Sequence, residues 1–279
     1  MKIAKITSGL GAFAVAATMG AAANAADLPS RREAVAPAPV FVDTFHPFQI
    51  RLRATAVIPN GSSTVYDTWG MIPPVAGLTY GAGSPIWGAG AQASVSVIPE
   101  IDVSYYFTKN FAIEAICCAS YHKVNGKGLL NGLNIGKTWV FPPTIMLQYH
   151  FTNFGAFQPY VGVGVNFTAF FGQSAGNNWA PFYTPIGQVG FNSITAMKIG
   201  TSWGVAGQVG FDYMINDRWG VNVDLKRIMM RPTATGLLYN SGLNAYVPWR
   251  AKVNIDPWVV SAGITYRFGG AAGPVVAKY

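Results

Sequence analysis

Few residues in this chain carry the side chains that catalysis or metal binding requires. The sequence holds three histidines and two cysteines among 279 residues. A nucleophilic triad needs a histidine close to a serine and a carboxylate, and His46, His122 and His150 show no such pattern. A bond between the adjacent Cys117 and Cys118 would strain the backbone, and no other cysteine exists to pair with them. We therefore expect neither an enzyme nor a bound metal or cofactor.

Charged side chains, by contrast, recur at regular positions. The stretch WGVNVDLKR (219–227) alternates apolar residues with small, polar or charged ones. Side chains of a β-strand alternate between two faces, so this stretch predicts a strand with one apolar and one polar face. The same alternation places nine charged residues on the polar faces: Arg51, Arg53, Glu100, Asp102, Glu114, Asp212, Asp224, Lys226 and Arg267. Five acids nearly balance four bases, so these groups can pair with one another.

Composition indicates which face points inward. The chain is 51% hydrophobic but only 11% charged, whereas soluble domains carry about 25% charged residues. Only helices and closed barrels satisfy every backbone group in lipid, and beyond the N-terminus no apolar run is long enough for a spanning helix. In lipid each charge would cost roughly 2–4 kcal/mol near the midplane. We therefore expect a barrel with its charges in the lumen and its apolar face against lipid.

Eight alternating segments have the length of tilted spanning strands. They are Phe48–Ile58, Val97–Phe107, Phe111–His122, Thr144–Phe151, Tyr160–Phe171, Trp203–Met214, Trp219–Met229 and Val253–Phe268. Three connections between them are short and four are long, and aromatic residues gather at both ends of the segments. Loops sorted by length and two aromatic girdles are typical of outer-membrane barrels. The predicted fold is all-β: an eight-stranded antiparallel transmembrane β-barrel with short periplasmic turns and long extracellular loops.

The N-terminus carries an export signal. Lys2 and Lys5 precede a short apolar core, and Ala23-Asn24-Ala25 forms an A-x-A cleavage site. We predict a signal peptide over 1–25, a Pro-rich periplasmic lead-in over 26–47, the barrel over 48–268 and a C-terminal tail over 269–279. Export to the bacterial outer membrane excludes nucleic acid as the partner of a chain whose net charge is +8.

Several of these segments resemble one known family. The stretches VIPEIDVSYYFTKNFAIEAI (97–116), GKTWVFPPTIMLQYHF (136–151), FQPYVGVGVNFTAFF (157–171), SWGVAGQVGFDYMINDRWGVNVDLK (202–226) and VNIDPWVVSAGITYRF (253–268) are similar to the outer-membrane protein W (OmpW) family. The resemblance implies an eight-stranded outer-membrane barrel with a narrow apolar lumen that admits small hydrophobic molecules. Barrels of this kind usually end on an aromatic residue that the barrel-assembly machinery reads. Here YRF is followed by Gly269–Tyr279, so either Phe268 or Tyr279 has that role.

Sorting the inward positions by depth predicts a layered lumen. A charged floor lies nearer the short turns: Arg51, Arg53, Asp102, Glu114, Asp212, Asp224 and Arg267. An apolar mouth lies nearer the long loops: Val57, Ile116, Cys118, Met146 and Thr168. An apolar mouth suits passive passage of small hydrophobic solutes. The alternative is a structural or interaction barrel with a plugged lumen, which contacts a host, phage or lipopolysaccharide through its loops, because eight-stranded barrels are often filled by side chains.

Basic residues and prolines supply two further hypotheses. Basic side chains in the long loops suit lipopolysaccharide phosphates and are expected in a belt above the outer girdle: Lys123, Lys127, Lys137, Lys198, Arg231, Arg250 and Lys252. Proline cannot donate to a β-ladder and weakens the wall around it. Because a charged floor would stop an apolar solute, we expect a lateral exit into the bilayer beside Pro99, next to Ile98 and Ile101.

Overall fold

The computed structural model describes residues 45–68, 70, 81–176, 178–184 and 187–270. They belong to one compact unit, Phe41–Tyr279. The predicted signal peptide, most of the predicted lead-in and the tail beyond 270 lie outside the described residues. Every regular element in the described part of the chain is a β-strand. No helix in those residues is both long enough and apolar enough to span a membrane.

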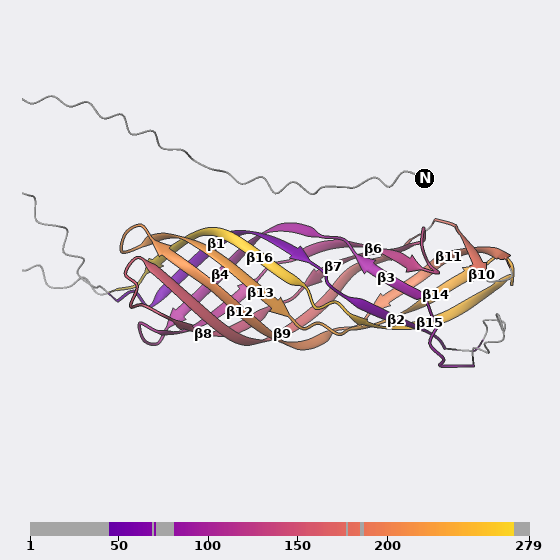
Figure 1. The fold of residues 1–279 in the computed structure, drawn as a ribbon, viewed down its shortest axis with the longest axis horizontal. Coiled ribbons are helices and arrows are strands. Elements are labelled where there is room, and N and C mark those ends of the chain that lie inside the picture. Colours follow the sequence, from indigo (N-terminus) through magenta and orange to yellow (C-terminus); the bar gives the residue numbers. More distant parts are fainter. Residues whose placement is uncertain (1–44, 69, 71–80, 177, 185–186, 271–279) are drawn as a thin grey trace, which may run out of the picture. The chain divides into compact units, whose positions relative to one another are not determined.

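Eight strands form a closed antiparallel barrel (Figure 1). They are β1 (Phe48–Ile58), β4 (Ser96–Tyr106), β5 (Phe111–Cys117), β8 (Thr144–His150), β9 (Phe157–Ala175), β12 (Ser202–Met214), β13 (Trp219–Ile228) and β16 (Trp258–Phe268). Neighbours pair in the order β12-β13-β16-β1-β4-β5-β8-β9, and β9 pairs with β12 to close the ring. The predicted fold class is confirmed.

Two predicted strands end differently in the structure. The segment predicted to run from 111 to 122 is divided, because β5 ends at Cys117 and a new strand begins at Ser120. The segment predicted to begin at 253 is divided before β16. Asp256 there has a φ of 33°, and Pro257 cannot donate to a ladder.

The outward face of the barrel is the apolar one. On β13, Val221, Val223 and Leu225 are exposed, whereas Asp224 and Lys226 are each 1% exposed. Rings contact one another at both ends of the wall, for example Trp219 with Tyr266 at the short-turn end and Tyr121 with Trp139 at the other. The charged face therefore points into the lumen.

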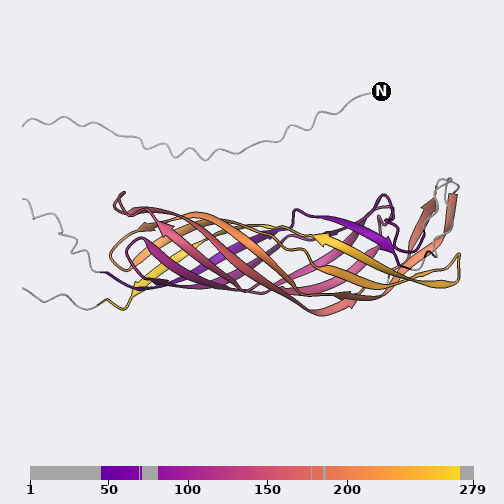
Figure 2. The same ribbon diagram turned by 90° about the horizontal axis from the view of Figure 1, so that it is seen from below.

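The described parts of the four long connections contain further β-strands, which the sequence did not predict. They are β2 (Ser62–Asp67), β3 (Ala89–Ala93), β6 (Ser120–Gly128), β7 (Asn134–Phe141), β10 (Ala180–Thr184), β11 (Gly187–Ile199), β14 (Thr233–Asn240) and β15 (Ala245–Asn254). Figure 2 shows them continuing the barrel away from the short turns. One sheet runs β10-β11-β14-β15-β2, while β3, β6 and β7 join the upper half of β9. Both groups contribute to one apolar core, which includes Val65, Leu133, Ile194 and Trp249.

Side chains bridge the two places where these sheets adjoin. Among the described residues, β9 and β11 form no backbone ladder. Instead, Gln173 Nε2 donates to Ile199 O at 3.0 Å, and Gln173 Oε1 accepts from Ile199 N at 2.6 Å. At the other place, Ala91 N donates to Ser63 Oγ at 2.7 Å. Backbone hydrogen bonds also cross this second place, where Ile86 N donates to Val65 O at 2.8 Å, so the upper wall is weaker mainly along the line between β9 and β11.

Gln173→Ala should loosen the junction of β9 and β11. It removes both hydrogen bonds to Ile199, each with a net value of about 0.5–1.5 kcal/mol, so the Ile199 amide should exchange with solvent about tenfold faster or more. Hydrogen exchange of the refolded barrel measures this. Ser63→Ala is the control, because it acts on the other junction. Unchanged protection at Ile199 in the Gln173 variant would show that the junction does not depend on this side chain.

Candidate functional site

Arg51 is at the centre of the charged floor. Its side chain is fully buried on β1, with Nη1 2.5 Å from Glu114 Oε1 and Nη2 2.8 Å from Asp212 Oδ2. Its guanidinium also lies over the Tyr160 ring, 5.1 Å from the centroid. One arginine therefore links β1 to β5, β9 and β12 across the lumen.

A second group of charges lies around Arg53. Arg53 Nη2 is 2.5 Å from Asp102 Oδ2 and 2.9 Å from Glu100 Oε1. Lys226 Nζ is 2.7 Å from Asp224 Oδ1 and 3.0 Å from Glu100 Oε1. A buried ion lacks the solvation of water, and such pairing is what makes its burial tolerable.

The structure brings together all seven residues predicted for the floor. Arg267 completes the set, since its Nη2 lies 3.6 Å from Asp212 Oδ2. Glu100 and Lys226 belong to the same network, although the predicted floor did not include them. The antiparallel register explains part of the clustering, because Arg51 pairs with Asp102 and Arg53 with Glu100 on β1 and β4.

Neutral side chains close the floor, and the sequence-based prediction missed most of them. Gln148 Nε2 donates to Glu114 Oε2 at 2.6 Å, and Gln208 Nε2 donates to the same oxygen at 2.9 Å. His150 Nε2 lies 3.0 Å from Gln148 Oε1, so His150 is a hydrogen-bonded lumen residue. These residues could have been found from the sequence, because the alternation of the strands places them on the inward face. With Tyr160 also 1% exposed, the lower lumen is packed with side chains.

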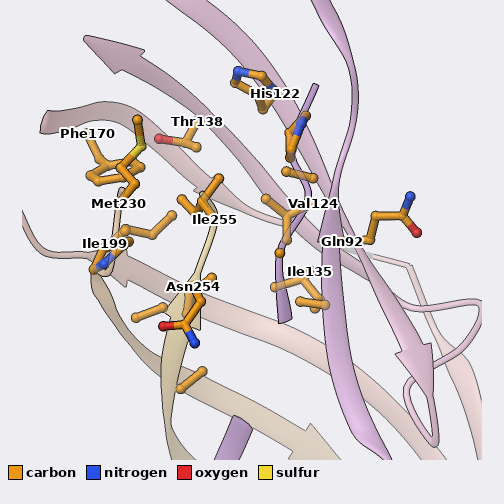
Figure 3. Close-up of a pocket in the computed structure, with 18 of the residues that line it drawn as sticks. Gln92, His122, Val124, Ile135, Thr138, Phe170, Ile199, Met230, Asn254 and Ile255 are labelled. Carbon is orange, nitrogen blue, oxygen red and sulfur yellow. The ribbon is translucent and has the colours of Figure 1, made fainter. Parts of the chain in front are cut away.

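An apolar cavity of about 390 Å³ lies above this floor. Glu100 and Lys226 are at its base. Figure 3 shows part of its wall, with Phe170, Met230 and Ile255 on one side and Val124 and Ile135 on the other. The cavity continues from the barrel into the space between the outer strands, so the outer strands enlarge it beyond what the barrel alone would enclose.

Three of the five residues predicted for the apolar mouth line this cavity: Val57, Ile116 and Cys118. The other two, Met146 and Thr168, are not among its lining residues, although Met146 packs in the same apolar cluster as Ile116. Met146 is fully buried, and its sulfur would lie 2.5 Å from a Cβ built on Gly164. Met146 thus covers a glycine of the next strand and does not face the open space. The Thr168 hydroxyl donates to Asn166 Oδ1 at 2.6 Å, which draws it into the wall.

The wall beside Pro99 has a break in its ladder. The pairing of β4 with β5 ends at Ile101 and Cys117. The next backbone hydrogen bond above this point runs from Ser94 N to Lys123 O, at 2.9 Å. Pro99 and Ile101 are exposed on the outside, whereas Ile98 is half-buried.

The backbone nitrogen of Pro99 faces this break in the ladder. Tyr106 N donates toward β1, to Pro47 O, and Phe107 N donates toward β5, to Phe111 O. Donor direction alternates along a strand, and the register of β4 is unbroken between Ser96 and Tyr105. The nitrogen of Pro99 is therefore on the β5 side and has no proton to donate there.

All seven basic residues predicted to face lipopolysaccharide are exposed on the outer strands or their connections. Lys123 and Lys137 are directly opposite each other. Each lies two residues from a residue of the girdle pair Tyr121 and Trp139 along its strand. The others lie at different heights. Lys127, for example, is four residues beyond Lys123, near the end of β6.

A closed antiparallel barrel with an apolar outside and paired charges inside is an outer-membrane barrel protein. A family model described as the OmpW family matches residues 47–268, and the chain belongs to this family. It is 36% identical over 222 residues to an outer-membrane protein y4mB of Sinorhizobium fredii, covering 80% of both chains. It is 32% identical to outer membrane protein W of Vibrio cholerae, covering 84% of this chain and 94% of that one. The crystal structure of OprG from Pseudomonas aeruginosa matches with a TM-score of 0.63 at 26% identity, covering 81% and 97%.

Arg51→Leu should destabilise the barrel strongly. It leaves Glu114 and Asp212 buried with one partner fewer, and breaking a buried ion pair costs about 3–5 kcal/mol. Urea unfolding in lipid vesicles measures the free energy of unfolding. Arg218→Leu, at an exposed turn, is the control and should change it by no more than about 0.5 kcal/mol. Equal losses in the two variants would contradict a structural role for the floor.

Proposed function

We propose that this barrel gives passive passage to small hydrophobic molecules, from the cell exterior into the outer membrane. The apolar cavity above a closed, charged floor is the observation that carries this proposal. Apolar pockets with few polar groups suit apolar ligands, and the OmpW family resemblance implies the same class of solute. A solute held above the floor would have to desolvate or separate the Arg51 and Arg53 ion pairs to continue along the axis.

A sideways exit beside Pro99 avoids that barrier. Two other prolines near the upper ends of barrel strands, Pro143 and Pro257, differ from Pro99 because the ladder continues next to them. Phe167 N donates to Pro143 O at 3.1 Å, and Ile228 N donates to Pro257 O at 3.3 Å. Pro99, by contrast, adjoins the unpaired stretch above Ile101 and Cys117. Cys118, which lines the cavity, lies at the same break. The exit thus joins the cavity to the lipid next to Ile101.

Met230→Trp tests the cavity. Met230 is 3% exposed and lines it, so a bulkier ring there should reduce uptake of a small apolar solute into liposomes severalfold. Met229→Trp is the matched control, because Met229 is 44% exposed on the outside, where tryptophan suits the membrane interface. The same uptake by both variants would count against passage through the cavity and would favour a structural or interaction barrel.

Pro99→Val tests the exit. Valine restores a donor on the open side of β4, so a wall hydrogen bond of about 0.5–1.5 kcal/mol can form, and apolar uptake should slow while the barrel still assembles. Pro143→Val is the control, because the ladder beside Pro143 is already continuous. Unchanged uptake by a well-folded Pro99→Val protein would rule this exit out.

Contact with lipopolysaccharide is a second proposed role. Lys123 and Lys137 face each other without an acidic side chain in ion-pair distance among the described residues. Like charges directly opposite on a sheet repel each other, and a phosphate between them would remove that repulsion. The other five basic residues (Lys127, Lys198, Arg231, Arg250 and Lys252) are also exposed on the outer strands or their connections.

Phe268 is proposed as the residue that the assembly machinery reads. It is the last residue of β16, and its ring stacks on Phe48, with centroids 5.5 Å apart. Tyr279, the other candidate, lies outside the described residues.

A further inference from the structure

Arg227 is a basic residue on the lipid-facing side of the wall. It follows Val221, Val223 and Leu225 on the same outward face of β13 and is half-buried. Its guanidinium carbon lies 4.8 Å from the ring centroid of Trp258, the residue directly opposite on β16. Tryptophan marks the interface of a bilayer, so this arginine is at the level of the outer headgroups.

The guanidinium of Arg227 has no acceptor in the described part of the chain. No carboxylate is within ion-pair distance of it, and no hydrogen bond from its side chain is formed there. Nη1 is buried without a partner, whereas Nε and Nη2 are not among the buried atoms. The Nε–Nη2 edge is therefore turned outward. A planar pair of N–H groups of this kind binds a phosphate in bidentate fashion.

A shallow groove adjoins the arginine. Gly207 is directly opposite Arg227 on β12 and points outward. A Cβ built on Gly207 would meet no atom within 4 Å. Its neighbours on that face stand free, with Trp203 74% exposed and Val163 67% exposed. The missing side chain leaves an apolar trough between Val163 of β9 and Arg227 of β13, which are the residues directly opposite Gly207.

We propose that Arg227, Trp258 and Gly207 form a binding site for a phosphorylated lipid of the outer leaflet, the lipid anchor of lipopolysaccharide. The phosphate is held by the outward edge of the guanidinium, and one acyl chain lies in the trough over Gly207. Trp258 fixes the guanidinium by a cation–π contact. This site deepens the proposed contact with lipopolysaccharide and rests on it for the identity of the lipid. It is independent of passage through the cavity.

Binding of lipid A to the purified full chain in neutral detergent tests the site. Native mass spectrometry counts the bound lipid, with lipid A stripped of its phosphates as the comparison probe. Arg227→Leu should weaken binding of phosphorylated lipid A about tenfold, since hydrogen bonds to charged groups are worth about 1.5–3 kcal/mol. Gly207→Val keeps every charge and has room for its side chain, and it should weaken binding severalfold by filling the trough. Arg218→Leu, a cation lost at a periplasmic turn, should change nothing.

Three results would overturn the proposal. One is equal affinity of the wild-type chain and Arg227→Leu, and another is equal binding of the stripped lipid. The third is displacement of the lipid by millimolar inorganic phosphate, which would make the site one for a free anion. The double variant Lys123→Gln/Lys137→Gln separates the wall site at Arg227 from the proposed contact of the outer strands with lipopolysaccharide. Loss of binding there, with Arg227→Leu unaffected, would leave the extracellular contact standing and remove the wall site.

Discussion

The bilayer supplies no hydrogen-bond partner to a backbone, and the rest of this structure depends on that constraint. The wall has to close on itself, which the pairing of β9 with β12 achieves. Closure of an alternating strand then sends one set of side chains into lipid and the other into a narrow lumen. Charges sent inward must find partners there, and Arg51 and Arg53 connect carboxylates from several strands. The closed wall and the paired charges of the floor therefore both follow from the lack of hydrogen-bond partners in the bilayer.

The charged floor closes the cavity at its lower end. Below Glu100 and Lys226 the lumen is filled by ion pairs and amide side chains, so the apolar space above ends blindly. Under the proposed passage of apolar solutes, a solute held in this blind cavity can return to the exterior, but it can enter the membrane only through a break in the wall. The outer strands serve the same end, because they continue the cavity beyond the barrel and bring Leu133, Ile135 and Ile194 to its surroundings.

Much of this was predictable from residue alternation. The period of two assigns Asp224 and Lys226 to one face and Leu225 to the other, and composition decides which face meets lipid. The contacts across the lumen were not predictable, because Arg51 and Asp212 are brought together by closure and not by a local pattern. The outer strands were missed because their glycines and polar residues resemble loops in isolation. The packing of Met146 over Gly164 was not predictable either, because the two residues belong to different strands.

The base of the cavity lies at different heights relative to the aromatic girdle around the barrel, and this bears on the proposed exit. On β13 the base of the cavity is Lys226, whose outward neighbour Arg227 already lies against the interfacial Trp258. An opening there would lead to headgroups. On β5 the cavity is lined by Ile116, and beyond it by Cys118, several residues before the girdle residue Tyr121. On that side the apolar space extends below the girdle, and the ladder break beside Pro99 is on the same side. A solute leaving there would meet acyl chains, which match its own chemistry.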